Sequence, residues 1–198
     1  MSDGIDIEFV RETYRKMTDD ELVRVATRDA SGLTEAAEEV VKEEIRRRGL
    51  DTNIIKGVEA QNTEYNFLDI DRYCEIVRDL DCPYCGSSEQ RLNGTLTSQV
   101  MSFIVFTSYK KELTVACPDC LDKENNKALT VSLVLGWWGI PWGIIRTIGA
   151  IRHNIKSKKT NRIEGVNDYL RGFVFAKVGQ VETYRNNKEK LQEIISGN

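Results

Sequence analysis

The sequence predicts an α+β protein in which a zinc ribbon with a central β-hairpin is flanked by helices. Three observations predict this class: capped helical patterns near the N-terminus, two Cys-x-x-Cys pairs separated by β-like sequence, and a long apolar segment followed by further helical periodicity. The 198 residues suit one ordinary domain or two small ones. With 40% hydrophobic residues and 14 glycines, the composition excludes wholesale disorder and a collagen-like chain.

Residues 1–50 are predicted to form a helical hairpin. Thr18 followed by Glu21 has the pattern of a capping box, and Thr34 is suited to cap a second helix. That helix would end in three arginines, which suit the negative end of the helix dipole, and Gly49 would be its C-cap. Nothing on the hairpin has a catalytic pattern, so we expect it to be structural or to bind a partner.

Residues 51–81 are more polar and less periodic, which predicts a linker with a short helix around Asp69–Leu80. Cys74 lies in this helix. We expect it to be a buried, inert thiol, and the alternative is a spare metal ligand or a regulatory thiol.

Residues 82–127 are predicted to form the zinc ribbon, with Cys82, Cys85, Cys117 and Cys120 as ligands in two knuckles. Two cysteines spaced in this way can hold one ion from a tight turn, and Gly86 tolerates the positive φ that such a turn often needs. Four thiolates make a closed, structural site for one Zn²⁺. A thioredoxin-type redox role is less favoured, because the βαβ context is missing and a second pair would not be needed.

The sequence between the two pairs has β character. Val100, Ser102, Ile104 and Phe106 alternate with the residues between them, as in a half-buried strand. We expect a turn in Ser108–Lys111 and a return strand over Leu113–Ala116.

Residues 128–198 are predicted to form an apolar, tryptophan-rich segment and a C-terminal helix packed on the ribbon. Ala128–Ile145 is a run of eighteen uncharged residues that contains Trp137, Trp138 and Trp142. This length is at the lower limit for a spanning helix, and Pro141 with its neighbouring glycines would interrupt one. The pattern therefore favours two short apolar helices joined at an aromatic bend. From Asn167 to Ile195 the periodicity predicts helix, with Gly179 as a point of bending or interruption.

Two interpretations of the apolar segment remain open. It is either the hydrophobic core or protein-docking surface of a soluble domain, or a bend that dips into one leaflet of a membrane. Charge is uneven along the chain, with a net of −9 over residues 1–145 and +7 over residues 146–190. In the membrane interpretation, anionic headgroups would meet the basic residues that follow the bend, which are Arg146, Arg152, Lys156, Lys158, Lys159 and Arg162.

Residues from Cys82 to about Lys190 resemble a family of uncharacterised, mainly bacterial zinc-ribbon proteins. The likeness rests on the two cysteine pairs, the string Leu-Gly-Trp-Trp-Gly-Ile-Pro-Trp-Gly at Leu135–Gly143, Asn154, and Asn167 with an aromatic-bearing helix after it. The first fifty residues are similar to a helical module found ahead of zinc ribbons and membrane segments. The resemblance implies zinc binding and a family whose members are frequently predicted to be membrane-associated, with no established activity. This chain differs from the family after the apolar segment, where it has the basic stretch Lys156–Arg162 and the family is rich in glycine.

Function is expected to be non-catalytic. The one histidine, His153, is in a basic context that disfavours its charged form, and a lone histidine on a polar face is expected to be solvated. No phosphate-binding loop, nucleophile elbow or zinc-protease helix is present. The sequence therefore predicts a zinc-binding interaction module that docks on a protein or an anionic membrane surface, without a small-molecule substrate. The alternative is a zinc ribbon that binds nucleic acid through basic residues 146–162. The N-terminus lacks a secretory pattern, which predicts a cytoplasmic protein, with peripheral attachment to the inner face of the membrane as an extension of that prediction.

Overall fold

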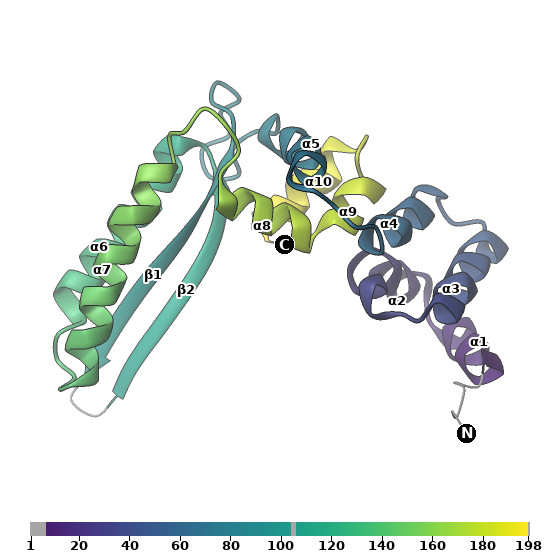
Figure 1. Ribbon diagram of the computed structural model, residues 1–198, viewed down its shortest axis with the longest axis horizontal. Helices are drawn as coiled ribbons and strands as arrows, with labels where there is room; N and C mark the ends of the chain where they lie inside the picture. The colour runs from purple at the N-terminus through teal and green to yellow at the C-terminus, as the bar shows by residue number, and fades with distance from the viewer. Residues whose placement is uncertain (1–6, 104–105, 198) are drawn as a thin grey trace. The chain divides into compact units, whose positions relative to one another are not determined.

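The computed structural model describes residues 7–103 and 106–197 (Figure 1). The chain is mainly helical with one β-hairpin, in agreement with the predicted mixed class. It divides into two compact units, which are described separately. The first contains the described part of Met1–Asp69 together with Ala176–Ile194, and the second contains Ile70–Phe175 and the residues from Ile195 onward.

The first unit is helical. Its helices are α1 (Ile7–Lys16), α2 (Asp19–Arg24), α3 (Glu35–Arg48), α4 (Asn53–Gln61), α9 (Val178–Thr183) and most of α10 (Lys188–Ser196), with a π-helical turn at Val25–Asp29 and a 3₁₀ turn at Ala30–Gly32. Apolar side chains from α2, α3 and α4, including Leu22, Ile45 and Val58, are fully buried together. Burial of such side chains is the main stabilising contribution in a helical unit of this kind.

The predicted helix caps of this unit are confirmed. Thr18 and Glu21 form the reciprocal capping box at the start of α2, and the Thr34 hydroxyl accepts a hydrogen bond from the N–H of Ala37 in α3. Gly49 ends α3 with a φ of 67°, a left-handed conformation that glycine adopts without strain.

The prediction of a linker over residues 51–81 misses α4. Its apolar residues, Ile54, Ile55 and Val58, are buried, and Gly57 lies against Gly179 and Thr183 of α9. The predicted C-terminal helix is divided into α8 (Asp168–Ala176), α9 and α10. Gly179 is inside α9, where the absence of a Cβ makes room for the side chain of Gln61.

The second unit is built around an antiparallel hairpin of β1 (Asn93–Phe103) and β2 (Phe106–Ala116), in register from Asn93 opposite Ala116 to Phe103 opposite Phe106. α6 (Pro118–Leu135) and α7 (Trp142–Thr160) pack on each other and on β1 (Figure 1). The unit also contains α5 (Phe67–Arg78) from Ile70 onward, and α8 up to Phe175.

The predicted turn at Ser108–Lys111 is wrong. These residues are inside β2, where Ser108 pairs with Met101 and Lys111 with Ser98. Their polarity reflects the half-buried or exposed position of these β2 side chains rather than a turn. Ile104, placed in the first strand by the sequence, is outside the described residues.

The apolar run does form two helices joined at a bend. α6 begins well before Ala128 and α7 ends well after Ile145, so each helix combines an apolar end with a polar end. Across residues 7–103 and 106–197, no helix is both long enough and apolar enough to cross a membrane.

Candidate metal centre and exposed apolar end

The first cysteine pair is held by a tight turn after α5. The N–H of Gly86 donates to the carbonyl of Cys82 at 2.8 Å, and the N–H of Cys82 donates to the carbonyl of Ser87 at 2.9 Å. Gly86 has a φ of 71°, the left-handed conformation that the sequence led us to expect. The turn therefore forms the predicted knuckle and places Cys82 and Cys85 on one side of the backbone.

The second pair does not form a knuckle and instead lies in the first turn of α6. Cys117 is the N-cap and Pro118 is at the start of the helix, a position where the missing N–H of proline costs little. A spacing of three residues brings Cys117 and Cys120 to neighbouring positions on the helix surface. The positive end of the helix dipole also favours thiolates here.

The four cysteines converge into one cluster whose sulfur atoms all lie within 4.8 Å of one another. The Sγ atoms of Cys85 and Cys117 are 3.7 Å apart. Tetrahedral Zn²⁺ with Zn–S bonds of about 2.3 Å requires S–S separations of about 3.8 Å, so the cluster fits this ion. Cys82, Cys117 and Cys120 are buried and Cys85 is exposed. Four protein ligands would leave no open position, which is the arrangement of a structural site.

The protonation of the cluster also suits a bound cation. Burial favours the neutral thiol of Cys82, but N–H groups of Cys117, Tyr84 and Cys85 outweigh it and lower the pKa of Cys82 to about 7. Burial raises the pKa of Cys117 and of Cys120 above the ordinary value. A divalent cation would supply the positive charge that these buried sulfurs need in order to ionise together.

Arg162, one of the predicted contact residues, is exposed and joins the end of α7 to the start of α6. Its guanidinium pairs with Asp119 at 2.6 Å and with Asp122 at 2.8 Å. Asp119 lies between the two cysteines of α6, and Arg162 lowers its pKa through this hydrogen bond, followed by the one from Gln90.

Cys74 is not part of the cluster. It is fully buried, as predicted, and burial raises its pKa to about 12. His153 differs from its prediction as a solvated residue. It is half-buried, and its Nε2 donates to the carbonyl of Leu96 at 2.8 Å.

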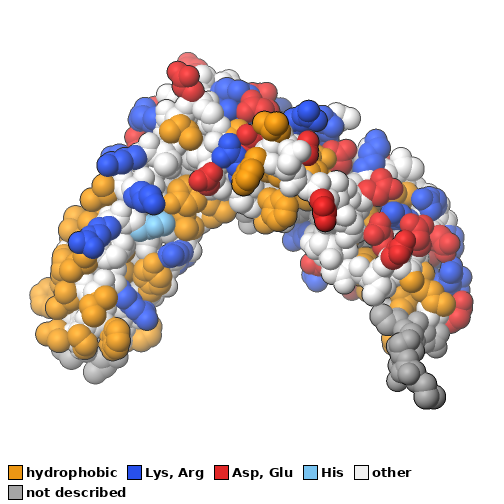
Figure 2. Space-filling view, in the orientation of Figure 1, with side chains coloured by type: hydrophobic (Ala, Val, Ile, Leu, Met, Phe, Trp, Pro, Cys, Tyr) orange, Lys and Arg blue, Asp and Glu red, His pale blue; other side chains and the backbone are white. Residues whose placement is uncertain are grey.

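The three tryptophans gather at the far end of the α6–α7 pair and are exposed: Trp137 to 40%, and Trp138 and Trp142 to 66% each. Further exposed apolar side chains surround them on α6, α7 and the hairpin, as Figure 2 shows for one face. We call this set the apolar end: Phe103, Phe106, Leu133, Val134, Trp137, Trp138, Ile140, Trp142, Ile144, Ile145 and Ile148. The bend is therefore not the buried core that one interpretation of the sequence proposed. Phe103 and Phe106, which the sequence placed in the predicted strand but not in the contact surface, belong to the same surface.

Near the apolar end, the side chains that α6 and α7 turn inward are small or polar. Ser132, Thr147 and Asn154 are fully buried, whereas Leu133 and Val134 of α6 and Ile144, Ile145 and Ile148 of α7 are exposed. Gly139 and Gly143 lie so close to Ser102 of β1 that a side chain at either position would collide with it. Near the apolar end, the inward sides of α6 and α7 are thus more polar than their outward sides.

Inward-facing polar groups close the edge of β1 that does not pair with β2. Asn154 donates through Nδ2 to the carbonyl of Ser98 at 2.6 Å and accepts from the N–H of Ser98 at 2.8 Å. The N–H of Val100 donates to the Ser132 hydroxyl at 3.1 Å. A strand edge normally exposes such groups to water or to another strand, and here the two helices satisfy them.

The polar groups of the tryptophans are satisfied internally as well. The indole N–H of Trp137 donates to the carbonyl of Leu133 at 2.7 Å, and that of Trp138 donates to the carbonyl of Val134 at 3.2 Å. These carbonyls belong to the last turn of α6, where a helix leaves carbonyl groups unpaired.

The remaining predicted contact residues follow one another along α7. Arg146, Arg152, Lys156 and Lys159 are exposed, and the guanidinium of Arg146 lies 5.9 Å from the centre of the Tyr109 ring. Lys158 is half-buried and donates to the side chain of Asn126 on α6 at 2.9 Å.

Comparison with protein-family models, curated proteins and solved structures finds no match to this chain. The fold and the site define it as a mixed α+β protein with a four-cysteine cluster that could hold one metal ion such as zinc.

Proposed function

We propose that this chain is a non-catalytic module, stabilised by one Zn²⁺, that docks on a membrane by inserting its apolar end into one leaflet. The observation that carries the proposal is the exposure of three tryptophans among eight other large apolar residues at one end of the second unit. Contiguous apolar surfaces of this kind mark interaction sites, and moving tryptophan rings out of water removes a large apolar area from contact with it.

The internal hydrogen bonds of the second unit favour lipid rather than a protein partner as the environment of the apolar end. Lipid provides no hydrogen bonds, so an inserted structure must satisfy its backbone internally. This requirement is met along the part of β1 bound by Asn154 and Ser132 and at the α6 carbonyls bound by Trp137 and Trp138. The outer edge of β2 pairs with no strand of the described residues. Small residues between the helices and polar side chains that link them are also typical of structures surrounded by lipid.

The lengths of the elements match one leaflet. With the elements along the membrane normal, α7 rises about 15 Å from Trp142 to Arg152, and α6 spans about 12 Å from Leu135 back to Lys127. β2 spans about 13 Å from Phe106 to Lys110. Half of the hydrocarbon core of a bilayer is about 15 Å thick, so these charged residues would all reach the headgroup region.

Arg146 is the one charged residue within this depth on α7. It follows Trp142 by four residues, and its guanidinium lies over the Tyr109 ring. Arginine can keep its apolar stem in lipid and extend its charged group toward the headgroups, so its position is compatible with insertion.

Flotation of the zinc-loaded chain with neutral and anionic liposomes tests the proposal. We expect the chain to float, and Trp138→Ser combined with Trp142→Ser to reduce partitioning at least tenfold. A matched control is Phe67→Ser combined with Leu68→Ser, which removes two apolar side chains that are 80% and 73% exposed outside the apolar end. An unchanged tryptophan double variant, or an equal loss in the control, would refute insertion through the apolar end. Failure of the native chain to float, with binding to nucleic acid instead, would favour the alternative function.

A further inference from the structure

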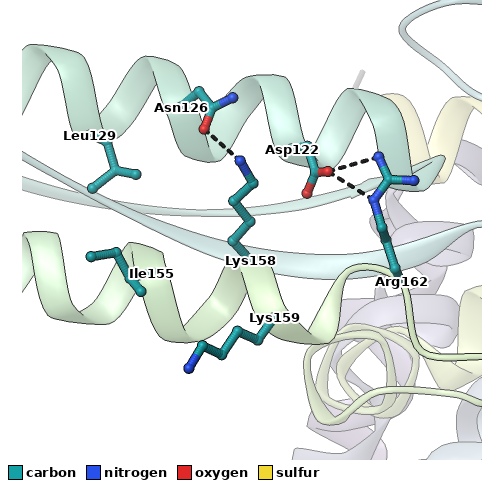
Figure 3. A pocket seen from close by; sticks show the side chains of 7 residues that line it. All are labelled: Asp122, Asn126, Leu129, Ile155, Lys158, Lys159 and Arg162. Atoms are coloured by element: carbon teal, nitrogen blue, oxygen red, sulfur yellow. Dashed lines mark hydrogen bonds and ion pairs between the residues drawn. The ribbon is translucent and has the colours of Figure 1, made fainter.

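A groove of about 450 Å³ opens between α6 and α7 on the second unit (Figure 3). Its lining residues are Asp122, Asn126 and Leu129 from α6, Ile155, Lys158 and Lys159 from α7, and Arg162 just beyond α7. None of them belongs to the cysteine cluster or to the apolar end.

The lining changes from apolar to cationic along the groove. Leu129 and Ile155 face each other at one end, and Lys158, Lys159 and Arg162 follow toward the other (Figure 3). Both oxygens of the one acidic residue, Asp122, are already hydrogen-bonded, Oδ1 by Asn161 and Oδ2 by Arg162. The groove thus combines an apolar floor with a positive charge excess.

The two lysines differ in how they are held. Lys158 reaches across the groove to Asn126, at 2.9 Å. Lys159 extends along α7 on the side of Ile155 (Figure 3) and has no hydrogen bond or ion pair with another side chain in the described part of the chain. One ammonium group is therefore fixed and the other is available to a ligand beside it.

The groove lies at the height where lipid phosphates would be. Lys158 follows Trp142 by sixteen residues, which is about 24 Å along α7. Side chains of a helix lean toward its N-terminus, so these lysines lean back toward the apolar end. With the apolar end at the bilayer midplane, the outer boundary of the headgroups is about 20–22 Å away.

We infer that the groove binds an anionic phospholipid. Its phosphate would lie on Lys158 and Lys159, and the upper part of an acyl chain would cover Leu129 and Ile155. This inference rests on the proposed membrane docking and adds to it a defined headgroup site, beyond general attraction between a basic surface and an anionic membrane. A free phosphate ion shares the charge but cannot use the apolar floor, so the lipid is the occupant that matches the whole lining.

The first test compares two charge-matched variants on vesicles of phosphatidylcholine with and without 20% phosphatidylglycerol. Lys158→Gln combined with Lys159→Gln removes two charges from the groove, and Arg152→Gln combined with Lys156→Gln removes two from exposed positions of α7 outside it. A generally attractive surface loses about fivefold in affinity per charge, which is about 25-fold for either pair. If the groove is a specific site, the affinity of the groove variant should fall at least fivefold more than that of the control, and this difference should persist in 0.5 M salt. Equal losses would overturn the inference.

The second test does not depend on docking. Dihexanoyl phosphatidylglycerol below its micellar concentration is titrated into the full chain, and amide shifts are followed by NMR. We expect shifts around Leu129 and Ile155 that are lost in the groove variant and absent with dihexanoyl phosphatidylcholine. Absence of these shifts with the native chain overturns the inference even if vesicles bind, and equal affinity for inorganic phosphate shows an ion site rather than a lipid site. Saturable, selective shifts without flotation would retain the groove and refute the proposed docking.

Discussion

Replacing Asn154 with leucine tests whether the closed edge of β1 holds the second unit together. Asn154 is fully buried and makes two hydrogen bonds with the backbone of Ser98, at 2.6 and 2.8 Å. Leucine has a similar volume but can make neither bond. It would therefore leave the N–H and the carbonyl of Ser98 buried and unpaired.

An unsatisfied buried group costs about 1–3 kcal/mol, so losing both partners should lower the free energy of unfolding by about 4 kcal/mol. Urea unfolding monitored by tryptophan fluorescence measures this effect, because all three tryptophans belong to the second unit. Asn126→Leu is the matched control: its residue is exposed on α6, and its one side-chain bond, to Lys158, is also exposed. A loss below about 1 kcal/mol for Asn154→Leu, or an equal loss in the control, would show that water can replace the side chain at the β1 edge.

Three further outcomes are expected. Cys82→Ser combined with Cys85→Ser should remove bound zinc, measured by mass spectrometry, and unfold the second unit; full metal content with unchanged melting would contradict a structural metal site. The hydrogen bond from Arg47 lowers the pKa of Glu44 more than burial raises it, and with the bond from Arg48 it holds this pKa at about 2. Ionised Glu44 therefore stabilises the folded chain above its ordinary pKa near 4.5, and this stabilisation is lost as the pH falls toward 2. Circular dichroism should therefore show a steeper loss of stability between pH 5 and 2.5 in the native chain than in Glu44→Gln, and parallel curves would refute this role. Gly139→Ala should cost about 1–3 kcal/mol in the fluorescence-monitored urea transition, because the added methyl group meets Ser102, and an unchanged midpoint would contradict the close approach.

Local rules predicted the features that depend on near neighbours in the chain. These features depend on geometry within a few residues: the capping box joins the side chains of Thr18 and Glu21 to the nearby backbone, and the left-handed conformation of Gly49 and Gly86 suits a residue without a Cβ. The joining of Cys82/Cys85 with Cys117/Cys120 was predicted from chemistry, because four thiolates at these spacings are the preferred ligands of one tetrahedral ion.

Features that depend on distant partners were predicted less well. Ser108–Lys111 has a turn-like composition, yet pairing with Ser98–Met101 keeps these residues in β2. The Cys-x-x-Cys spacing is the same in a knuckle and in a first helical turn, so the cysteines alone did not show that Cys117 begins α6. α4 is short and has a glycine in its middle, and close packing of Gly57 against α9 outweighs the low helix propensity of that glycine.

The apolar run shows why a count of hydrophobic residues did not determine its role. Hydrophobic periodicity normally identifies the face of a helix that packs inward, but near the bend the buried residues are Ser132 of α6 and Gly143, Thr147 and Asn154 of α7, while Leu133, Val134 and the isoleucines Ile144, Ile145 and Ile148 are exposed. Small residues let the helices approach β1 closely, and their polar side chains bind its free edge. Burying the isoleucines instead would separate the helices from β1 and leave Ser98 and Val100 without partners. The hydrogen bonds of β1 and the exposure of the tryptophans thus have one cause: near the bend, the space between the helices and β1 has room only for small side chains.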